Sequence, residues 1–168
     1  MSTFVFVNTY AHSVTYVADK MLLSLKEIIR ESGLSPEKLT DGWRILQQGI
    51  STWIGSRHLE TVVLEVFDPY KGTLVGRWDF EIYYGSVGDG AMWVNTEDIK
   101  YHIRKAGHWP SLCDYRVVTT TKLGRPDVIG WSATTLRSTD GFVRQSIGTT
   151  IDGNGYIGAG TAYWRKAQ

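Results

Sequence analysis

The chain has 168 residues, enough for one domain that buries a hydrophobic core without disulfides or a structural metal. A formal net charge of +1 argues against strong nucleic-acid binding, and the single cysteine, Cys113, excludes an internal disulfide and a cysteine-based metal site. No apolar run reaches the roughly 18 residues of a membrane-spanning helix, and the first residues lack the pattern of a signal peptide. We therefore expect one cytoplasmic domain over residues 1–168, without direct membrane contact.

The first third of the chain predicts a short strand and two amphipathic helices. Apolar residues at 4–7 indicate the strand, and apolar residues at three- and four-residue spacing over 12–33 predict a long helix. A second helix is expected over 35–55, where a serine cap and a proline precede another apolar stripe. Gly42 and Gly49 lie in this segment and indicate a weakened helix or close packing against a neighbour.

Beyond the second helix, alternation with a period of two predicts β-strands. Residues 61–66 and 74–84 flank the turn DPYKG, so we expect an antiparallel hairpin with one buried face. A third helix follows, capped by Asn95 or Thr96, and a further strand follows at 112–122. This pattern is typical of an α+β fold with a mostly antiparallel sheet.

The remaining residues, 123–168, consist of short β-prone pieces separated by Gly, Pro and Asp, without a helical period. Such long irregular segments are uncommon in a compact domain unless they are functional or disordered. Aromatic side chains from Trp131 to Trp164 argue against disorder, because they need to be buried. We predict that residues 123–168 wrap around the body of the domain as a β segment.

One motif in this tail has the spacing of a dinucleotide-binding turn, because Gly153, Gly155 and Gly158 form G-x-G-x-x-G. Such a turn needs a strand before it, a helix after it, and an acidic residue about twenty positions further on. The residues that follow, TAYWRKAQ, supply neither the helix nor the acid. We interpret the glycines as points where the backbone turns, and we expect no nucleotide or other cofactor.

Two clusters of titratable residues are candidates for chemistry. Asp79 and Glu81 share one face of the predicted hairpin, where a carboxylate pair suits acid–base catalysis. Asp98, His102 and His108 are candidates for a metal site. Solvated polar faces explain both clusters more simply, and no nucleophile has a base and an orienting group. We expect no catalytic residue and no metal, with a small hydrolase that uses these residues as the alternative.

Binding is the remaining class of function. The strand at 112–122 is rich in β-branched residues and leads directly into the aromatic tail. If this strand lies at a sheet edge, an extended peptide can pair with it, and the tail can cross over the peptide and slow its release. The seven Trp and nine Tyr leave a carbohydrate- or nucleic-acid-binding domain as a second alternative.

Several segments resemble the bacterial HORMA-domain proteins of CBASS (cyclic-oligonucleotide-based anti-phage signalling) operons. They are HSVTYVADKMLLSLKEIIRESGL, GISTWIG, GRPDVIGWS, RSTDGFVRQSIG and AYWRK, and together they cover nearly the whole chain in order. The resemblance implies a HORMA fold, in which three helices pack on a mostly antiparallel β-sheet. It also implies a C-terminal safety belt with two positions, which in the closed state wraps a closure-motif peptide against the sheet.

The resemblance further implies partners rather than catalysis. In its closed state such a protein binds and activates a nucleotidyltransferase (CD-NTase), which makes a cyclic-oligonucleotide second messenger. An AAA+ remodelling ATPase opens the closed form by pulling on the N-terminal segment. The expected ligand of the HORMA protein itself is a closure-motif peptide, from phage or self.

Carried over to this sequence, the resemblance divides the chain into an N-terminal segment (1–9), a core (10–122) and a safety belt (123–168). The strand that pairs with the peptide is expected to use Tyr115, Val117 and Thr119, or the alternate register. The expected belt anchors are Trp131, Arg137 and Trp164, and the expected remodeller-engaging residues are Ser2, Thr3, Phe4 and Val5.

Overall fold

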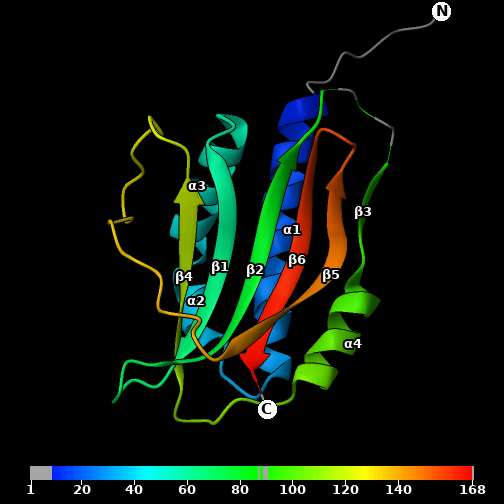
Figure 1. Ribbon diagram of the computed structural model, residues 1–168. Coiled ribbons are helices and arrows are strands. Elements are labelled where there is room, and N and C mark those ends of the chain that lie inside the picture. The colour runs from blue at the N-terminus through cyan, green and yellow to red at the C-terminus, as the bar shows by residue number, and fades with distance from the viewer. Residues whose placement is uncertain (1–8, 87, 89–90, 168) are drawn as a thin grey trace, which may run out of the picture.

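The computed structural model describes residues 9–86, 88 and 91–167, in which helices pack against a six-stranded sheet (Figure 1). The predicted strand at 4–7 lies outside the described residues. The elements are, in chain order, α1 (Thr9–Glu31), α2 (Glu37–Asp41), α3 (Trp43–Gly55), β1 (Leu59–Phe67), β2 (Leu74–Tyr84), β3 (Met92–Val94), α4 (Thr96–Ala106), β4 (Asp114–Thr121), β5 (Phe142–Gly153) and β6 (Ile157–Lys166). No helix of the described ranges is long and apolar enough to cross a membrane.

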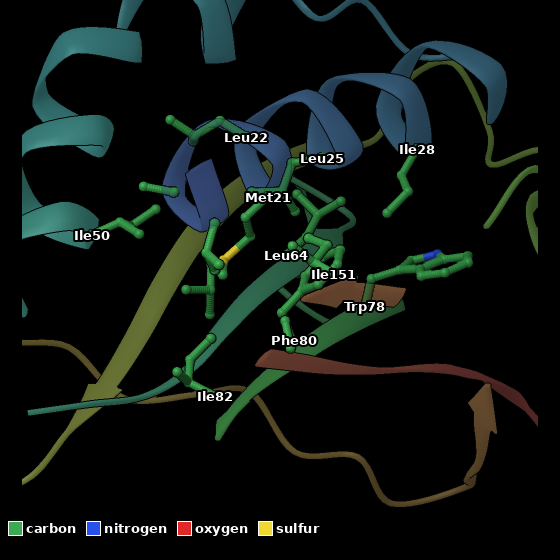
Figure 2. Packing of buried hydrophobic residues seen from close by; sticks show 14 of the residues in the cluster. Met21, Leu22, Leu25, Ile28, Ile50, Leu64, Trp78, Phe80, Ile82 and Ile151 are labelled. Carbon is green, nitrogen blue, oxygen red and sulfur yellow. The ribbon is translucent and has the colours of Figure 1, made fainter. Parts of the chain in front are cut away.

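The core lies between α1 and the sheet. The apolar stripe of α1 is fully buried at Met21, Leu25 and Ile28, which confirms the long helix predicted from its spacing. Figure 2 shows these side chains pointing towards Leu64 of β1 and Phe80 of β2. Burial of each such side chain stabilises the fold by roughly 1.5–3 kcal/mol relative to exposure, so α1 is the main support behind the sheet.

The second helix is divided at Gly42, where the prediction of one continuous helix over 35–55 is wrong. Gly42 has φ −94° and ψ 9°, outside the helical range, and it ends α2 and begins α3. Its N–H still donates to the carbonyl of Lys38 at 3.3 Å, so the two helices remain connected through a turn. The expected three helices are therefore four in the described residues, with α2 as a short separate piece.

The hairpin of β1 and β2 is confirmed, with register partners Thr61↔Glu81 at one end and Phe67↔Leu74 at the other. The expectation of a single buried face is wrong in the middle of the hairpin. Val63 and Glu65, which point away from the helices, are also buried. The reason is that the C-terminal part of the chain returns over this face, as described below.

Helix α4 begins and ends as predicted. The side chain of Asn95 caps it by accepting the N–H of Asp98 at 3.1 Å, and Gly107, with φ 83°, follows its last turn. Ile99 and Ile103 are buried and belong to the same core as α1. The helix therefore packs beside α1 on the same core and does not form a separate unit.

The sheet has the order β3-β5-β6-β2-β1-β4, and neighbouring strands are antiparallel throughout the described residues. The tail predicted to wrap the body divides into two parts. Residues 123–141, which we call the crossing segment, have little regular structure, whereas β5 and β6 form a hairpin inside the sheet. Since β6 lies between β5 and β2, this hairpin is part of the folded core.

The motif G-x-G-x-x-G lies at the turn between β5 and β6 and does not precede a helix. Asn154 and Gly155 have φ values of 62° and 74°, and the N–H of Gly155 donates to the Asp152 carboxylate at 2.7 Å. Such positive φ angles favour Asn and Gly, as in tight hairpin turns. The glycines therefore serve a strand–turn–strand connection, as their interpretation as turn residues predicted.

Candidate functional site

Strand β4 lies at the edge of the sheet. It pairs with β1 from Asp114 to Thr121, and no strand of the described residues pairs with its other side. Near the start of β4, the N–H of Tyr115 donates to Asp114 Oδ1 at 2.7 Å. The carbonyl of Tyr115 accepts a hydrogen bond from Lys38 Nζ at 2.8 Å. Both main-chain groups of Tyr115 therefore point away from β1.

This orientation determines which other residues of β4 face outwards. In an antiparallel pair, the N–H and C=O of one residue point to the same side, and the side alternates along the strand. Val117 and Thr119 consequently present their main-chain groups outwards, and Arg116 and Val118 present theirs to β1. The structure thus places Tyr115, Val117 and Thr119 in one outward-facing register.

The side chains of this register lie on the helix face of the sheet. The hydroxyl of Tyr115 donates to the carbonyl of Ser35 at 2.8 Å and accepts the N–H of Leu39 at 3.2 Å. Burial raises the pKa of the Tyr115 phenol, so it remains a neutral donor at physiological pH. These contacts tie the start of β4 to the region where α2 begins.

The crossing segment starts on the same helix face. Trp53 Nε1–H donates to the carbonyl of Pro126 at 2.7 Å, and Trp131 Nε1–H donates to the carbonyl of Ile45 at 3.1 Å. The rings of Trp53 and Trp131 meet edge to face, with centroids 5.0 Å apart. Gly49 makes this contact possible, because a Cβ there would lie 2.3 Å from Trp131 Nε1. The close packing predicted for Gly49 is thus explained.

The crossing segment then passes the free edge of β4 and reaches the opposite face of the sheet (Figure 1). Arg116 donates to Thr134 Oγ1 at 2.8 Å and to the carbonyl of Thr135 at 2.6 Å. Arg137 donates its Nε–H to the carbonyl of Gly72 at 2.8 Å. The segment is therefore attached on both faces of the sheet, and it encloses the edge of β4 between the two attachments.

The centre of the second attachment is Glu65, a fully buried carboxylate on β1. Its Oε2 accepts the main-chain N–H of Arg137 at 2.6 Å. Its Oε1 accepts Arg116 Nε at 2.7 Å and Arg137 Nη1 at 3.0 Å. Two guanidinium groups and one amide thus compensate the buried charge, as a buried carboxylate requires.

Trp164, the third expected anchor, lies elsewhere. It is on β6, where its Nε1–H donates to Asp79 Oδ2 at 3.0 Å and its ring lies 5.3 Å from the Arg77 guanidinium. Strands β2 and β1 separate β6 from β4. The structure therefore brings Trp131 and Arg137 to the edge of β4 and leaves Trp164 within the β2–β6 pair. The expected remodeller-engaging residues Ser2, Thr3, Phe4 and Val5 lie outside the described residues.

The residues considered for chemistry have structural contacts. Asp79 accepts Arg77 Nε at 2.7 Å, in addition to Trp164, while Glu81 is exposed. His102 Nδ1 lies 3.2 Å from the hydroxyl of Tyr163, and its Nε2 lies 3.8 Å from Asp98. Within the described parts of the chain, no group of three or more His, Cys, Asp and Glu could hold a metal ion. Through its contacts with Arg77 of β2 and Trp164 of β6, Asp79 is part of the packing between these two strands.

Part of the aromatic content that suggested a carbohydrate- or nucleic-acid-binding surface lies inside the protein. Trp53, Trp78 and Tyr163 are each 1% exposed, and Trp78 stacks on Tyr163 with ring centroids 4.8 Å apart. These rings are core residues and cannot stack on a ligand without unfolding. These three rings therefore carry no argument for a binding platform, whereas Tyr70, Tyr83, Trp93 and Tyr101 are exposed.

Some residues of this site were not predicted from the sequence. Glu65, Arg116 and Ile45 hold or border the crossing segment, yet none was among the expected anchors. One signal was available for Glu65, because it is the single charged residue in the run VVLEV. An acid in an otherwise apolar strand indicates a paired buried charge or a bend towards solvent.

A family model described as bacterial HORMA domain 2 matches residues 1–167. No curated protein sequence matches the chain. Among solved structures, a chain of the mitotic checkpoint complex is similar with a TM-score of 0.74 and 10% identity, covering 93% of this chain and 99% of that one.

Two further structures have the same fold. C. elegans HTP-2 bound to the HIM-3 closure motif has a TM-score of 0.70 and 11% identity, covering 99% of this chain and 100% of that one. A chain of the E. coli MS115-1 complex of CdnC with HORMA-deltaN has a TM-score of 0.60 and 10% identity, covering 100% and 94%. The α+β architecture and the family match agree, and this chain belongs to the bacterial HORMA domain 2 family.

Proposed function

We propose that this protein is a peptide-binding signalling adaptor in which a closure-motif peptide adds as a strand to the free edge of β4. The observation that carries the proposal is the edge itself, outward-facing at Tyr115, Val117 and Thr119 and enclosed by the crossing segment. Unpaired N–H and C=O groups at a sheet edge are a template for strand addition. Residues 123–168 then correspond to the safety belt, of which the crossing segment is the part that encloses the peptide.

The energetics favour a bound peptide that leaves slowly. Each main-chain hydrogen bond contributes roughly 0.5–1.5 kcal/mol net. The N–H and C=O groups of Val117 and Thr119 therefore contribute about 2–6 kcal/mol, which is less than the roughly 8 kcal/mol of a micromolar complex, so side-chain contacts supply the rest. Because the crossing segment is attached at Trp131 on one face and at Arg137 on the other, a peptide beneath it cannot leave sideways. Release requires one attachment to open, which lowers the dissociation rate rather than raising the association rate.

The proposed partners follow from the family. The complex of CdnC with HORMA-deltaN supports a CD-NTase as the enzyme that this adaptor binds and activates in its closed, peptide-bound state. We further propose that an AAA+ ATPase reopens the closed form by engaging Ser2, Thr3, Phe4 and Val5. In this scheme the adaptor itself performs no chemistry, and the second messenger is made by the CD-NTase.

A proline substitution in β4 tests strand addition. The full-length chain is first used to select binders from a display library of random linear peptides, and their affinities are measured by calorimetry. Val117→Pro removes an outward N–H without removing a hydrogen bond to β1, and proline is tolerated in edge strands at such positions. Val117→Ala is the matched control, because it removes the side chain and keeps the N–H.

We expect Val117→Pro to bind the selected peptides at least about tenfold more weakly than Val117→Ala, at a similar unfolding midpoint. Equal affinities of the two variants would exclude β4 as the peptide-binding edge. For the partner, the selected peptide should raise second-messenger synthesis by a CD-NTase mixed with the wild-type chain. The adaptor and peptide alone, with nucleoside triphosphates, should give no product.

A further inference from the structure

An apolar cavity lies beside the outward-facing edge of β4. It has a volume of ≈ 200 Å³ and lies between the α2–α3 junction and the start of β4. Most of the wall surface is apolar and comes from Leu39, Gly42, Ile45, Leu46, Tyr115 and Val117, while Lys38 and Arg116 also contribute to the lining. Ile45, at its rim, is 46% exposed, so the cavity is open to a ligand that approaches along the edge.

The cavity has a fixed position relative to the main-chain groups of β4. Tyr115, on its wall, already uses both outward groups, with Asp114 and Lys38 as partners. The first residue of β4 with outward groups left for a ligand is therefore Val117, which also lines the cavity. A strand added to β4 begins at the cavity and extends from there towards Thr119.

The crossing segment contacts Ile45, one of the residues that line the cavity. Trp131 Nε1–H donates to the carbonyl of Ile45, and a Cβ on Gly130 would lie 2.7 Å from Ile45 Cγ2. Gly130 has φ 95°, a conformation that favours glycine, so the close approach and the backbone shape coincide. Ile45 therefore borders both the cavity, where a ligand side chain would lie, and the crossing segment.

We infer that this cavity is the anchor pocket of the peptide site. It takes one bulky apolar side chain, and this anchor lies at the end of the paired stretch rather than in its middle. The inference rests on the proposed function, because it names the class of peptide that the same edge selects. The size fits, since an apolar cavity of about 150 Å³ in another protein accommodates benzene. An apolar side chain is favoured over a charged one, because most of the wall is apolar and the two basic residues of the lining, Lys38 and Arg116, are already paired with Asp114 and Glu65.

The test is a double-mutant cycle between the pocket and the peptide. Gly42 lies in the wall, and a Cβ there meets only the carbonyls of Lys38 and Leu39, at 3.6 and 3.9 Å. Its φ of −94° is accessible to other residues. Gly42→Leu places bulk at the cavity, and Gly42→Ala is the matched control that adds only the Cβ.

Peptides selected on the wild-type chain should carry one recurrent bulky apolar residue near one end of the shared motif. Its truncation to Ala should weaken binding to the wild type and to Gly42→Ala by about tenfold to a hundredfold. On Gly42→Leu the same truncation should cost less than about threefold, because the pocket is already filled. A truncation that costs the same on all three proteins overturns the anchor pocket.

The two proposals fail in different ways. If selected peptides bind and lose affinity in Val117→Pro, but show no apolar anchor or no coupling to Gly42, strand addition stands and the pocket assignment is wrong. If no peptide is selected, or binding is insensitive to Val117→Pro, the proposed function itself is wrong. Melting temperatures of both Gly42 variants within a few degrees of wild type establish that a loss of binding is not a loss of fold.

Discussion

The main-chain N–H of Arg137 donates a hydrogen bond of 2.6 Å to the fully buried carboxylate of Glu65. The guanidinium of Arg137 binds the other oxygen of the same carboxylate at 3.0 Å. One residue of the crossing segment is thus held by β1 through both its main chain and its side chain. Because a buried carboxylate is stable only while paired, this contact favours the position in which the crossing segment encloses β4.

Replacement of Glu65 by Gln should loosen the crossing segment. Gln keeps the shape but removes the charge that pairs with Arg116 and Arg137. We expect the free energy of unfolding to fall by about 3 kcal/mol. Amide hydrogens over 123–141 should exchange at least about tenfold faster in hydrogen–deuterium exchange measured by mass spectrometry.

The control for this variant is Glu81→Gln, which changes an exposed carboxylate on β2. That variant should leave both the stability and the exchange of the crossing segment within error of wild type. Exchange over 123–141 that is the same in Glu65→Gln and Glu81→Gln contradicts the role assigned to Glu65.

Replacement of Gly49 by Ala should displace Trp131. The added Cβ would lie 2.3 Å from Trp131 Nε1, so the indole has to move away from α3. In isolation the substitution favours the helix by about 0.8–1.0 kcal/mol. We nevertheless expect faster peptide dissociation, by about tenfold, because the first attachment of the crossing segment is lost. Surface plasmon resonance with an immobilised peptide measures this rate.

Gly55→Ala is the matched control, since a Cβ at Gly55, at the end of the same helix, has nothing within 4 Å. It should keep the wild-type dissociation rate. A Gly49→Ala variant that also keeps the wild-type rate shows that Trp131 does not retain the peptide.

The contact between Asp114 and Lys38 predicts a pH dependence of stability. Burial alone would raise the pKa of the Asp114 carboxyl, but hydrogen bonds from Lys38 and from the N–H of Tyr115 outweigh it and lower the pKa. A lowered folded-state pKa contributes stability that is complete above the unfolded value, about 3.9, and is lost as the pH falls through the folded value. The contribution is small, because both side chains are substantially exposed.

We expect the difference in unfolding free energy between wild type and Asp114→Asn to be constant from about pH 7 to pH 5 and to shrink below about pH 4. Urea denaturation at a series of pH values measures it. Asp140→Asn, an exposed position on the crossing segment, serves as the comparison. A difference that grows as the pH falls would contradict the assignment of Asp114 as an ionised partner of Lys38.

The parts of the fold that follow local periodicity were predictable from the sequence. The stripe of α1, the alternation of β1 and β2, and the Asn95 cap of α4 each depend on residues within a few positions of one another. The turn at Asn154 and Gly155 was predictable for the same reason, because the missing helix excluded a nucleotide turn.

The rest depends on contacts between residues that are distant in the sequence. Glu65 is buried because Arg137, 72 positions later, returns over its face of the sheet. The outward carbonyl of Tyr115 is bound by Lys38, 77 positions earlier in the sequence. Trp164, expected as an anchor of residues 123–168, contacts Asp79 of β2 rather than the edge of β4, because β6 pairs with β2. Sheet order, unlike strand position, is not encoded in any local pattern.

The central claim is that a peptide adds to the outer edge of β4, and residue-resolved hydrogen exchange by NMR tests it most directly. In the free chain the outward N–H groups of Val117 and Thr119 should exchange faster than that of Val118, which faces β1. Saturation with a selected peptide should slow Val117 and Thr119 by at least about tenfold and change Val118 little. Protection that is absent from β4, or that falls equally on Val117 and Val118, would contradict strand addition at this edge.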